Sequence, residues 1–230
     1  MVHFECELCE DMRFMTRNVP VDHEDFGKAF PCPVCGVNYQ QKHLLKLSRL
    51  NARQAAITLD DLHEAERPQT THMKAMARRV MAGELPWLTL IGQPGVGKST
   101  AMFAIVNHFR QQGLKAIYLD WSELLDFIRQ GYDPGEKHQS LWRVQLVQNA
   151  PVLCIDELDK ARPTDWMLEH LHRFVNHRWE AAKLPERERL VTVFAMNEEP
   201  QNEHIRSRLL DREFGYVFNH DSDYRSKVWT

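Results

Sequence analysis

The sequence has no long hydrophobic run, and no stretch approaches the ~20 apolar residues that a membrane-spanning helix needs. It also has no excess of basic charge, because its net charge is −3 at pH 7. Contact with nucleic acid therefore has to come from a local patch rather than from a global positive field. The first residues, Met1 to Cys6, lack the basic-then-apolar pattern of a signal peptide. These absences predict a cytoplasmic protein that makes no use of a membrane.

Cysteine is scarce, and four of the five cysteines lie in the first 41 residues. They form two C-x₂-C pairs, Cys6 with Cys9 and Cys32 with Cys35. Two such pairs supply the four thiolates of a tetrahedral zinc site. A disulfide framework is the weaker interpretation in a reducing cytoplasm. Because all four positions are filled, the predicted zinc is structural, and it would supply folding energy that ~40 residues cannot obtain from a core.

The chain is predicted to have three parts: a zinc-binding module at 1–41, a polar helical linker at 42–84 and an α/β domain at 85–230. Two linker stretches repeat apolar residues at helical spacing. These amphipathic helices are expected at Lys42–Ala55 and Gln69–Ala82, joined by a connector capped at Thr58 or Asp60. His3, His23 and His43 are possible substitute zinc ligands, although a complete set of four cysteines leaves them no position. Cys154 is predicted to be a small hydrophobic residue of a core strand.

From residue 86 onward, strand and helix patterns alternate, which predicts a mostly parallel sheet covered by helices. The expected strands are 87–91, 115–119, 151–155, 190–195 and 215–218. The expected helices lie near 98–112, 122–129, 138–149, 164–182 and 202–211. Only about a dozen residues follow the last strand, so we expect no helical lid domain after it.

The most informative motif runs from Gly92 to Ser99 and fits G-x-x-x-x-G-K-[ST], the phosphate-binding P-loop. It lies between a predicted buried strand and a predicted helix, as the mechanism requires. Its glycines allow backbone N–H groups to surround phosphate oxygens, and the helix N-terminus adds partial positive charge. Lys98 would reach the outer phosphates and Ser99 would hold Mg²⁺. The predicted nucleotide-binding residues are Gly92, Gln93, Pro94, Gly95, Val96, Gly97, Lys98, Ser99 and Thr100.

A second motif, Pro151 to Glu157, is a buried strand that ends in two adjacent carboxylates, about 60 residues after the P-loop. This is the pattern of a Walker B strand. Asp156 is predicted to lie behind the Mg²⁺ that Ser99 holds, and Glu157 to deprotonate the attacking water. Alternation of side chains along the strand would let the two carboxylates address metal and water separately. The alternative is that the pair caps a helix N-terminus.

Two further positions suit nucleotide hydrolysis. Asn197 follows the strand 190–195 and is predicted to act as a polar sensor beside the Walker B carboxylate, although a turn residue is the alternative. Arg208 and Arg212 are expected one helical turn apart, so that either would project toward a neighbouring protomer as an arginine finger. The alternative for these arginines is a solvated helix face paired with Glu203 and Asp211.

These motifs resemble the AAA+ ATPases, and within them the DnaC-type helicase loaders and the IstB-type transposition helpers. The resemblance spans roughly residues 57 to 228 and rests on the P-loop, Leu153–Glu157, Asn197 and Ser207–Leu209. It implies ATP as the nucleotide and a homo-oligomeric assembly. The ending Asp223-Tyr224-Arg225 is similar to the S-Y-R ending of that group, which implies that Arg225 acts as a second sensor. Asp156–Lys160 departs from the commoner D-D-L-G ending, and Met196 replaces the usual small residue.

The resemblance also implies partners. In this group the segment between the second and third strands grips single-stranded DNA, and basic and aromatic residues suit that role. Here they are Arg129, Tyr132, Lys137, His138, Trp142 and Arg143, although much of the segment fits an ordinary amphipathic helix. The zinc module resembles the N-terminal adaptor regions of DnaI-type loaders, which dock on the replicative helicase. Its apolar residues would serve docking or the module's own core: Phe4, Phe14, Met15, Phe26 and Phe30.

Four functions follow for testing. The first is an ATP-dependent loader of the hexameric replicative helicase, and the zinc module favours it. The second is a transposition helper ATPase that binds DNA and recruits a transposase. A small-molecule kinase is opposed by the Asp156-Glu157 pair and by Asn197. A nucleotide-binding switch without catalysis is disfavoured by Glu157.

Overall fold

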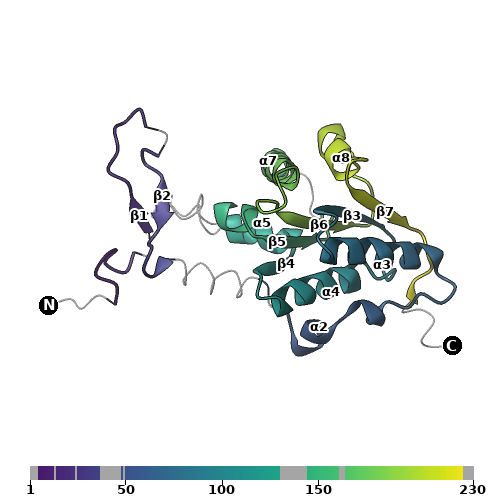
Figure 1. Cartoon of the computed structure of the whole chain (residues 1–230). Coiled ribbons are helices and arrows are strands. Elements are labelled where there is room, and N and C mark those ends of the chain that lie inside the picture. Colours follow the sequence, from purple (N-terminus) through teal and green to yellow (C-terminus); the bar gives the residue numbers. More distant parts are fainter. Residues whose placement is uncertain are drawn as a thin grey trace.

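The computed structural model describes residues 5–12, 14–23, 25–36, 48, 50–129, 144–160 and 164–224. Its centre is a parallel five-stranded sheet with strand order β4-β5-β6-β3-β7, as Figure 1 shows. The strands are β3 (Trp87–Gly92), β4 (Ala116–Asp120), β5 (Val152–Asp156), β6 (Val191–Met196) and β7 (Gly215–Asn219). The predicted parallel α/β fold and its five strands are therefore confirmed.

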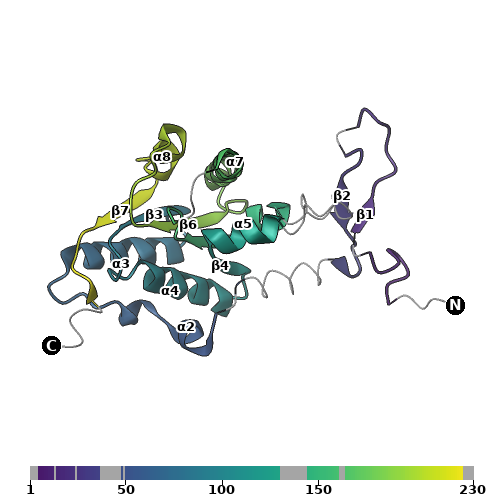
Figure 2. The same ribbon diagram turned by 180° about the vertical axis from the view of Figure 1, so that it is seen from behind.

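The two faces of the sheet are covered by different helices (Figures 1 and 2). One face packs against α3 (Pro68–Met81) and α4 (Lys98–Gln111). The other packs against α5 (Trp121–Arg129), α7 (Asp165–Ala182) and α8 (Glu203–Leu209). Because side chains alternate along a strand, Leu88 and Leu90 of β3 join the first cluster and Trp87 joins the second. Burial on both faces explains why the strands are nearly continuous apolar runs.

The linker follows the outer side of α4 and is only partly described. Its elements are α2 (Ala52–Ala56), the short 3₁₀ helix η1 (Leu59–Asp61) and α3, which is the helix expected at Gln69–Ala82. The Thr58 hydroxyl accepts the backbone N–H of Asp60, so the cap lies at Thr58, one of the two expected positions. Residues 42–47 of the first expected linker helix lie outside the described residues, and so do 138–143 of the helix expected near 138–149.

The N-terminal module contains a small hairpin that the sequence did not predict. Strand β1 (Phe14–Thr16) pairs antiparallel with β2 (Ala29–Pro31). One pair of cysteines, Cys6 and Cys9, precedes this hairpin in the sequence, and the other pair, Cys32 and Cys35, follows it. Figure 1 shows this module beside the sheet domain rather than within it. In the described part of the chain, no helix has both the length and the hydropathy to cross a bilayer.

A buried arginine ties α7 to the start of the sheet. Arg178 is fully buried and donates to the Thr192 hydroxyl at 2.8 Å and to the Ala150 carbonyl at 2.6 Å. It also donates to the carbonyls of Gln148 and Val191. Burial lowers the pKa of this guanidinium. Since buried polar groups need partners, these bonds fix where β5 and β6 begin and hence where their carboxyl ends point.

A candidate nucleotide site and a four-cysteine cluster

The P-loop joins β3 to α4, as the motif predicts, and two of its glycines adopt conformations that other residues rarely do. Gly95 has a φ of +84°, and Gly97, at the N-cap of α4, has a φ of +101°. Space is equally limiting, because a Cβ at Gly95 would lie 1.8 Å from the Asp223 carboxylate and one at Gly97 would lie 2.7 Å from the Leu62 side chain. The loop is thus shaped by residues far from it in sequence.

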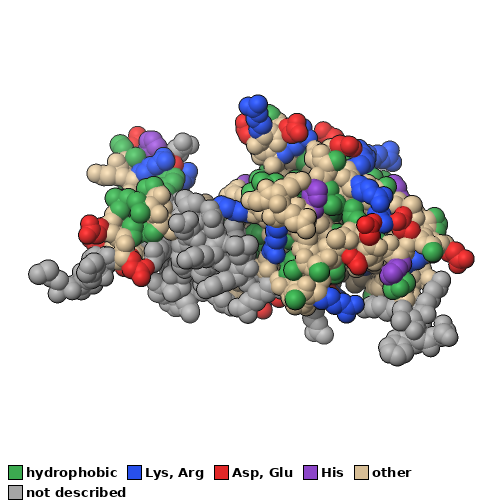
Figure 3. All heavy atoms as spheres, turned by 60° about the horizontal axis from the view of Figure 1, so that its bottom comes forward, with side chains coloured by type: hydrophobic (Ala, Val, Ile, Leu, Met, Phe, Trp, Pro, Cys, Tyr) green, Lys and Arg blue, Asp and Glu red, His purple; other side chains and the backbone are tan. Residues whose placement is uncertain are grey.

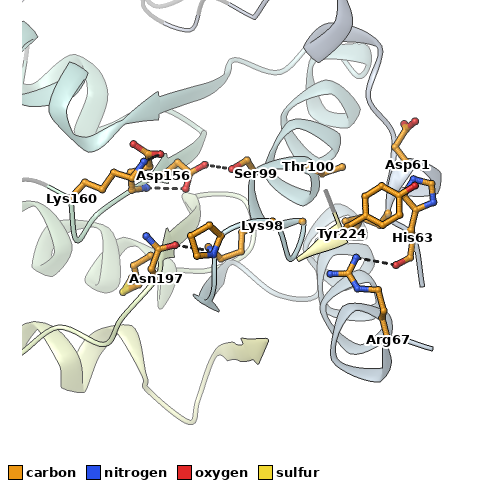
Figure 4. Close-up of a pocket in the computed structure, with 16 residues that line it drawn as sticks. Asp61, His63, Arg67, Lys98, Ser99, Thr100, Asp156, Lys160, Asn197 and Tyr224 are labelled. Carbon is orange, nitrogen blue, oxygen red and sulfur yellow. Dashed lines mark hydrogen bonds and ion pairs between the residues drawn. The ribbon is translucent and has the colours of Figure 1, made fainter. Parts of the chain in front are cut away.

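Lys98 is held within the loop that it follows. Its ammonium donates to the carbonyls of Gly92 at 2.6 Å and Gln93 at 3.1 Å, and to the Asn197 side-chain oxygen at 3.1 Å. Figure 4 shows the Lys98–Asn197 bond across the cavity. Lys98 and Asn197, predicted from separate motifs, are therefore in direct contact. The ammonium is a compact charge with three donors, so it can exchange these oxygen acceptors for phosphate oxygens.

Asp156 lies at the end of β5 and is only 3% exposed, and it receives three hydrogen bonds. Its Oδ2 accepts the Ser99 hydroxyl at 2.5 Å and the Tyr118 hydroxyl at 2.8 Å. Its Oδ1 accepts the backbone N–H of Glu157 at 2.8 Å. The two residues expected to share Mg²⁺, Ser99 and Asp156, are thus adjacent, as Figure 4 shows. A hydroxyl and a carboxylate are the oxygen donors that Mg²⁺ takes in such sites.

Glu157 follows the strand with a left-handed φ of +57° and forms an ion pair with Lys160. The expectation that strand alternation separates the two carboxylates was wrong, because β5 ends at Asp156 and the backbone turn redirects Glu157. The helix-cap alternative also fails, since the chain turns here and Thr164 caps α7. The Glu157 side chain is 38% exposed and lines the cavity, where water is available to it.

The acidic character of this corner extends to β4. Asp120 lies opposite Asp156 in the register of β4 and β5. Burial, followed by the charge of Glu157, raises the pKa of Asp120 to about 6. Asp120 therefore takes up a proton at mildly acidic pH, which reduces the local negative charge.

A residue that sequence reasoning missed fixes the chain after β6. The Asp159 carboxylate accepts the backbone N–H of Asn197 at 2.9 Å and that of Glu198 at 3.2 Å. It thereby holds Asn197 against Lys98. The only available signal was the departure of Asp156–Lys160 from the commoner motif ending.

The P-loop, the end of β5 and Asn197 line one cavity of about 310 Å³. At one end lie the P-loop, Asp156, Glu157, Lys160 and Asn197, and at the other lie residues from the linker and from the C-terminal segment. There the His63 and Tyr224 rings stack with centroids 4.0 Å apart and an interplanar angle of 11°. Sequence reasoning gave neither ring a role in the site, although Tyr224 belongs to the ending compared with S-Y-R, and it gave none to Asp61, Leu62 and Arg67, which also line this end. A cavity of this size with phosphate donors at one end and flat rings at the other suits a nucleotide.

The segment Asn219–Tyr224, here called the C-terminal strap, crosses from the sheet edge to the P-loop. The Asp221 carboxylate accepts the backbone N–H of Thr70 at 2.7 Å, at the start of α3. Arg67 donates to the Ser222 carbonyl at 2.9 Å, and the Tyr224 N–H donates to the Gly95 carbonyl at 3.2 Å. The predicted sensor Arg225 comes next and lies outside the described residues.

The two candidate finger arginines have different surroundings. Arg208 donates to the Asn176 side chain at 2.7 Å and to the His204 carbonyl at 3.0 Å, and it lies over the Trp179 ring. Arg212 is exposed and lies beyond α8, which ends at Leu209. The helix expected near 202–211 is present but ends at Leu209, so the expectation that both arginines lie on its consecutive turns was wrong. Among the expected DNA contacts, Tyr132, Lys137, His138, Trp142 and Arg143 lie outside the described residues.

The four cysteines converge as their spacing predicts. Their Sγ atoms all lie within 4.8 Å of one another. The Sγ atoms of Cys6 and Cys32 are 3.8 Å apart and those of Cys9 and Cys35 are 3.3 Å apart. A tetrahedral Zn–S₄ site with 2.3 Å bonds has sulfurs ~3.8 Å apart, so the cluster fits zinc. Burial raises the pKa of Cys32, but N–H groups of Cys35 and Val34 outweigh it and bring this pKa to about 6.

The profile of the ATPase family associated with various cellular activities (AAA) matches residues 88–214. The uncharacterized protein YqaM of Bacillus subtilis (strain 168) is 28% identical over 98 residues, which are 40% of this chain and 30% of that protein. The match therefore spans less than a third of the length of that curated relative.

Solved structures share the fold at low identity. The DnaC helicase loader has a TM-score of 0.56 at 21% identity, covering 74% of this chain and 99% of that one. Domain III of the Thermotoga maritima replication initiation protein DnaA has a TM-score of 0.59 at 17% identity, covering 78% and 72%. A putative primosome component of Streptococcus pyogenes serotype M3 has a TM-score of 0.54 at 19% identity, covering 76% and 92%. These likenesses are evidence for the fold alone.

We expect Gly95→Ala to loosen the C-terminal strap. The substitution holds an L-residue at a φ of +84°, which costs about 1–3 kcal/mol in the control as well, and it places a Cβ 1.8 Å from the Asp223 carboxylate. Only the second effect acts on the strap, because the clash is relieved when Asp223 moves away. Hydrogen exchange of the amides at 221–224 should become faster, as measured by mass spectrometry. Gly113→Ala is the matched control, because Gly113 has a φ of +79° but no neighbouring atom within 4 Å of the added Cβ. Equal exchange at the strap in both variants would contradict the expectation.

Proposed function

Because the chain belongs to the AAA family of ATPases, whose profile covers more than half of its length, we propose that it binds and hydrolyses ATP with Mg²⁺. The observation that carries this proposal is the contact between Ser99 of the P-loop and Asp156 of β5. It brings side chains of two distant motifs, which we propose bind phosphate and metal, into one cavity. The ring pair at the other end of that cavity supports a nucleotide as the ligand.

The roles of the side chains follow from their positions. Backbone N–H groups of the P-loop and the Lys98 ammonium would bind the phosphates, and Lys98 would exchange its loop carbonyls for phosphate oxygens. Ser99 and Asp156 would hold Mg²⁺, which supplies neutralisation of charge on the outer phosphates. Glu157 would leave Lys160 and take a proton from the attacking water. Asn197, fixed by Asp159, would orient that water or the terminal phosphate.

We further propose that the chain acts in replication as a loader of the hexameric replicative helicase. The four-cysteine module supports this, since it precedes the ATPase domain and exposes apolar side chains to solvent (Figure 3). The exposed apolar residues of the module are Leu8, Met12, Val21, Phe26 and Val34. Such residues on a small metal-stabilised module suit docking on a protein. Single-stranded DNA would bind the segment after α5, most of which lies outside the described residues.

Self-association would complete the ATPase site, with an arginine from a neighbouring protomer reaching the phosphates. Arg208 supports this role by being held in one orientation by Asn176 and Trp179. Arg212 supports it by being exposed. The two arginines therefore remain separate candidates for the same function.

The Glu157→Gln variant is expected to bind ATP but to hydrolyse it at least about 100-fold more slowly, because the amide cannot accept the proton of the attacking water. Lys98→Ala is expected to lose binding itself. Equilibrium binding of fluorescent ATP and phosphate release measure the two effects. Arg173→Ala, which removes an exposed arginine of α7, serves as the control with unchanged activity. Rapid turnover by Glu157→Gln would remove Glu157 from the role of base.

Mixing experiments distinguish the two arginines. A finger supplied in trans requires that inactive protomers lower the activity of wild-type neighbours, and that activity per chain rise with protein concentration. We expect this behaviour from either Arg208→Ala or Arg212→Ala, but not from Arg206→Ala. The charge of Arg206 is paired with the Glu199 carboxylate, whereas the acceptors of Arg208, Asn176 and the His204 carbonyl, are uncharged. Activity per wild-type chain that stays constant across all mixtures would contradict a trans finger.

The zinc site and the loader role are tested together in the full chain. We expect one zinc per chain by metal analysis, loss of the metal in Cys9→Ser and retention in His23→Ala. Phe26→Ser should weaken capture of the purified replicative helicase of the same host. Leu184→Ser, which changes an exposed apolar residue outside the module, should not. Capture of a transposase in place of the helicase would favour a transposition helper instead.

A further inference from the structure

Tyr118 touches the metal end of the nucleotide site without lining the cavity. It lies on β4, and its hydroxyl donates to Asp156 Oδ2 at 2.8 Å. Its ring packs against Phe103, with centroids 4.5 Å apart. Phe103 lies one turn after Ser99 on α4, so the helix that carries Ser99 also orients the Tyr118 ring. Burial raises the pKa of Tyr118 above its usual range, so the phenol keeps its proton and donates.

The geometry makes Tyr118 one of three groups that orient the Asp156 carboxylate. Ser99 and Tyr118 both donate to Oδ2, and the Glu157 N–H donates to Oδ1. The Ser99 hydroxyl is the group that a metal ion would engage. The other two donors would remain and would fix the plane of the carboxylate. A hydrogen bond to a charged, buried group is among the stronger ones in a protein.

The backbone of Tyr118 is in turn held by the chain that leaves the four-cysteine module. Among the residues that the structure describes, β4 is an edge strand whose one neighbour in the sheet is β5. The backbone N–H of Tyr118 is accepted by the Ser48 hydroxyl at 2.8 Å, where a further strand would otherwise offer a carbonyl. Ser48 is only 3% exposed, and its carbonyl accepts bonds from Leu50 and Arg110. It lies 13 residues after Cys35, the last cysteine of the cluster.

We propose that Tyr118 is a positioning residue for the metal end of the nucleotide site, and that Ser48 connects it to the chain leaving the four-cysteine module. A displacement of Ser48 would shift Tyr118 and reorient Asp156, and it would thereby change how the site holds Mg²⁺. This inference rests on the proposed binding of nucleotide and Mg²⁺ at the site.

The experiment measures binding rather than turnover. The probe is mant-ADP, and its Kd is determined by fluorescence with the full chain, once with Mg²⁺ and once with EDTA. The Kd ratio, defined as the Kd in EDTA divided by the Kd with Mg²⁺, isolates the part of binding that depends on the metal. Tyr118→Phe removes only the hydroxyl. Tyr216→Phe makes the same change on β7, the opposite edge strand, where the ring contacts Phe218.

In Tyr118→Phe the Kd ratio should fall by about tenfold, the size expected for one hydrogen bond to a charged group, while the Kd in EDTA stays near that of wild type. Tyr216→Phe should leave both values unchanged. A purely structural role of Tyr118 would change binding with and without Mg²⁺ alike. An unchanged ratio in Tyr118→Phe overturns the positioning role. If wild type binds no mant-ADP at all, the proposed function fails instead.

The connection to the linker has its own test. Ser48→Ala should lower the Kd ratio by about threefold, since it removes a hydrogen bond between uncharged groups, and Ser48→Thr should restore it by keeping the acceptor. The double variant Ser48→Ala with Tyr118→Phe should be no worse than Tyr118→Phe alone, because both act through one bond to Asp156. A wild-type ratio in Ser48→Ala, or full additivity in the double variant, overturns the connection.

Discussion

The nucleotide site depends on a buried carboxylate that is kept in place by hydrogen-bond donors. Asp156 receives bonds from a P-loop side chain, from an edge strand and from the backbone of the next residue. A buried anion is costly unless it is paired or hydrogen-bonded, so these donors also determine which arrangements of the surrounding elements are stable. The sheet order serves this arrangement, since it sets β5 next to both β4 and β6.

Two segments outside the sheet complete the site, one before it and one after it. The linker contributes η1 and His63, and the C-terminal strap contributes Tyr224. They meet in one ring stack, and both are tied to α3, the linker through Lys74 bonded to Glu64 and the strap through Thr70 bonded to Asp221. The same linker helix therefore fixes both segments, the part of the linker that precedes it and the C-terminal strap.

The sequence allowed prediction of what local chemistry dictates. The P-loop requires glycine at positive φ, the strands require apolar runs, and two C-x₂-C pairs require little more than a turn each. What it did not reveal depends on distant contacts. Tyr118, Asp159 and the His63–Tyr224 stack carry no local signature, because their roles arise only when segments separated by many residues lie side by side. The hairpin of the module was missed because each strand has only three residues. The helix expected to 211 ends early because Asp211 accepts the Glu213 N–H and starts a turn.

The register of β3 has a consequence for the order of events during synthesis. Trp87 pairs with Thr192 of β6, and Leu88 pairs with Gly215 of β7, so both neighbours of this strand are made more than 100 residues later. Contacts this far apart in sequence form slowly. A ribosome therefore synthesises the whole P-loop sequence long before β6 and β7, the two neighbours of β3, exist. Until then β3 stays an unpaired apolar segment. Translation of the last quarter of the chain is the step that turns the motif into a folded loop.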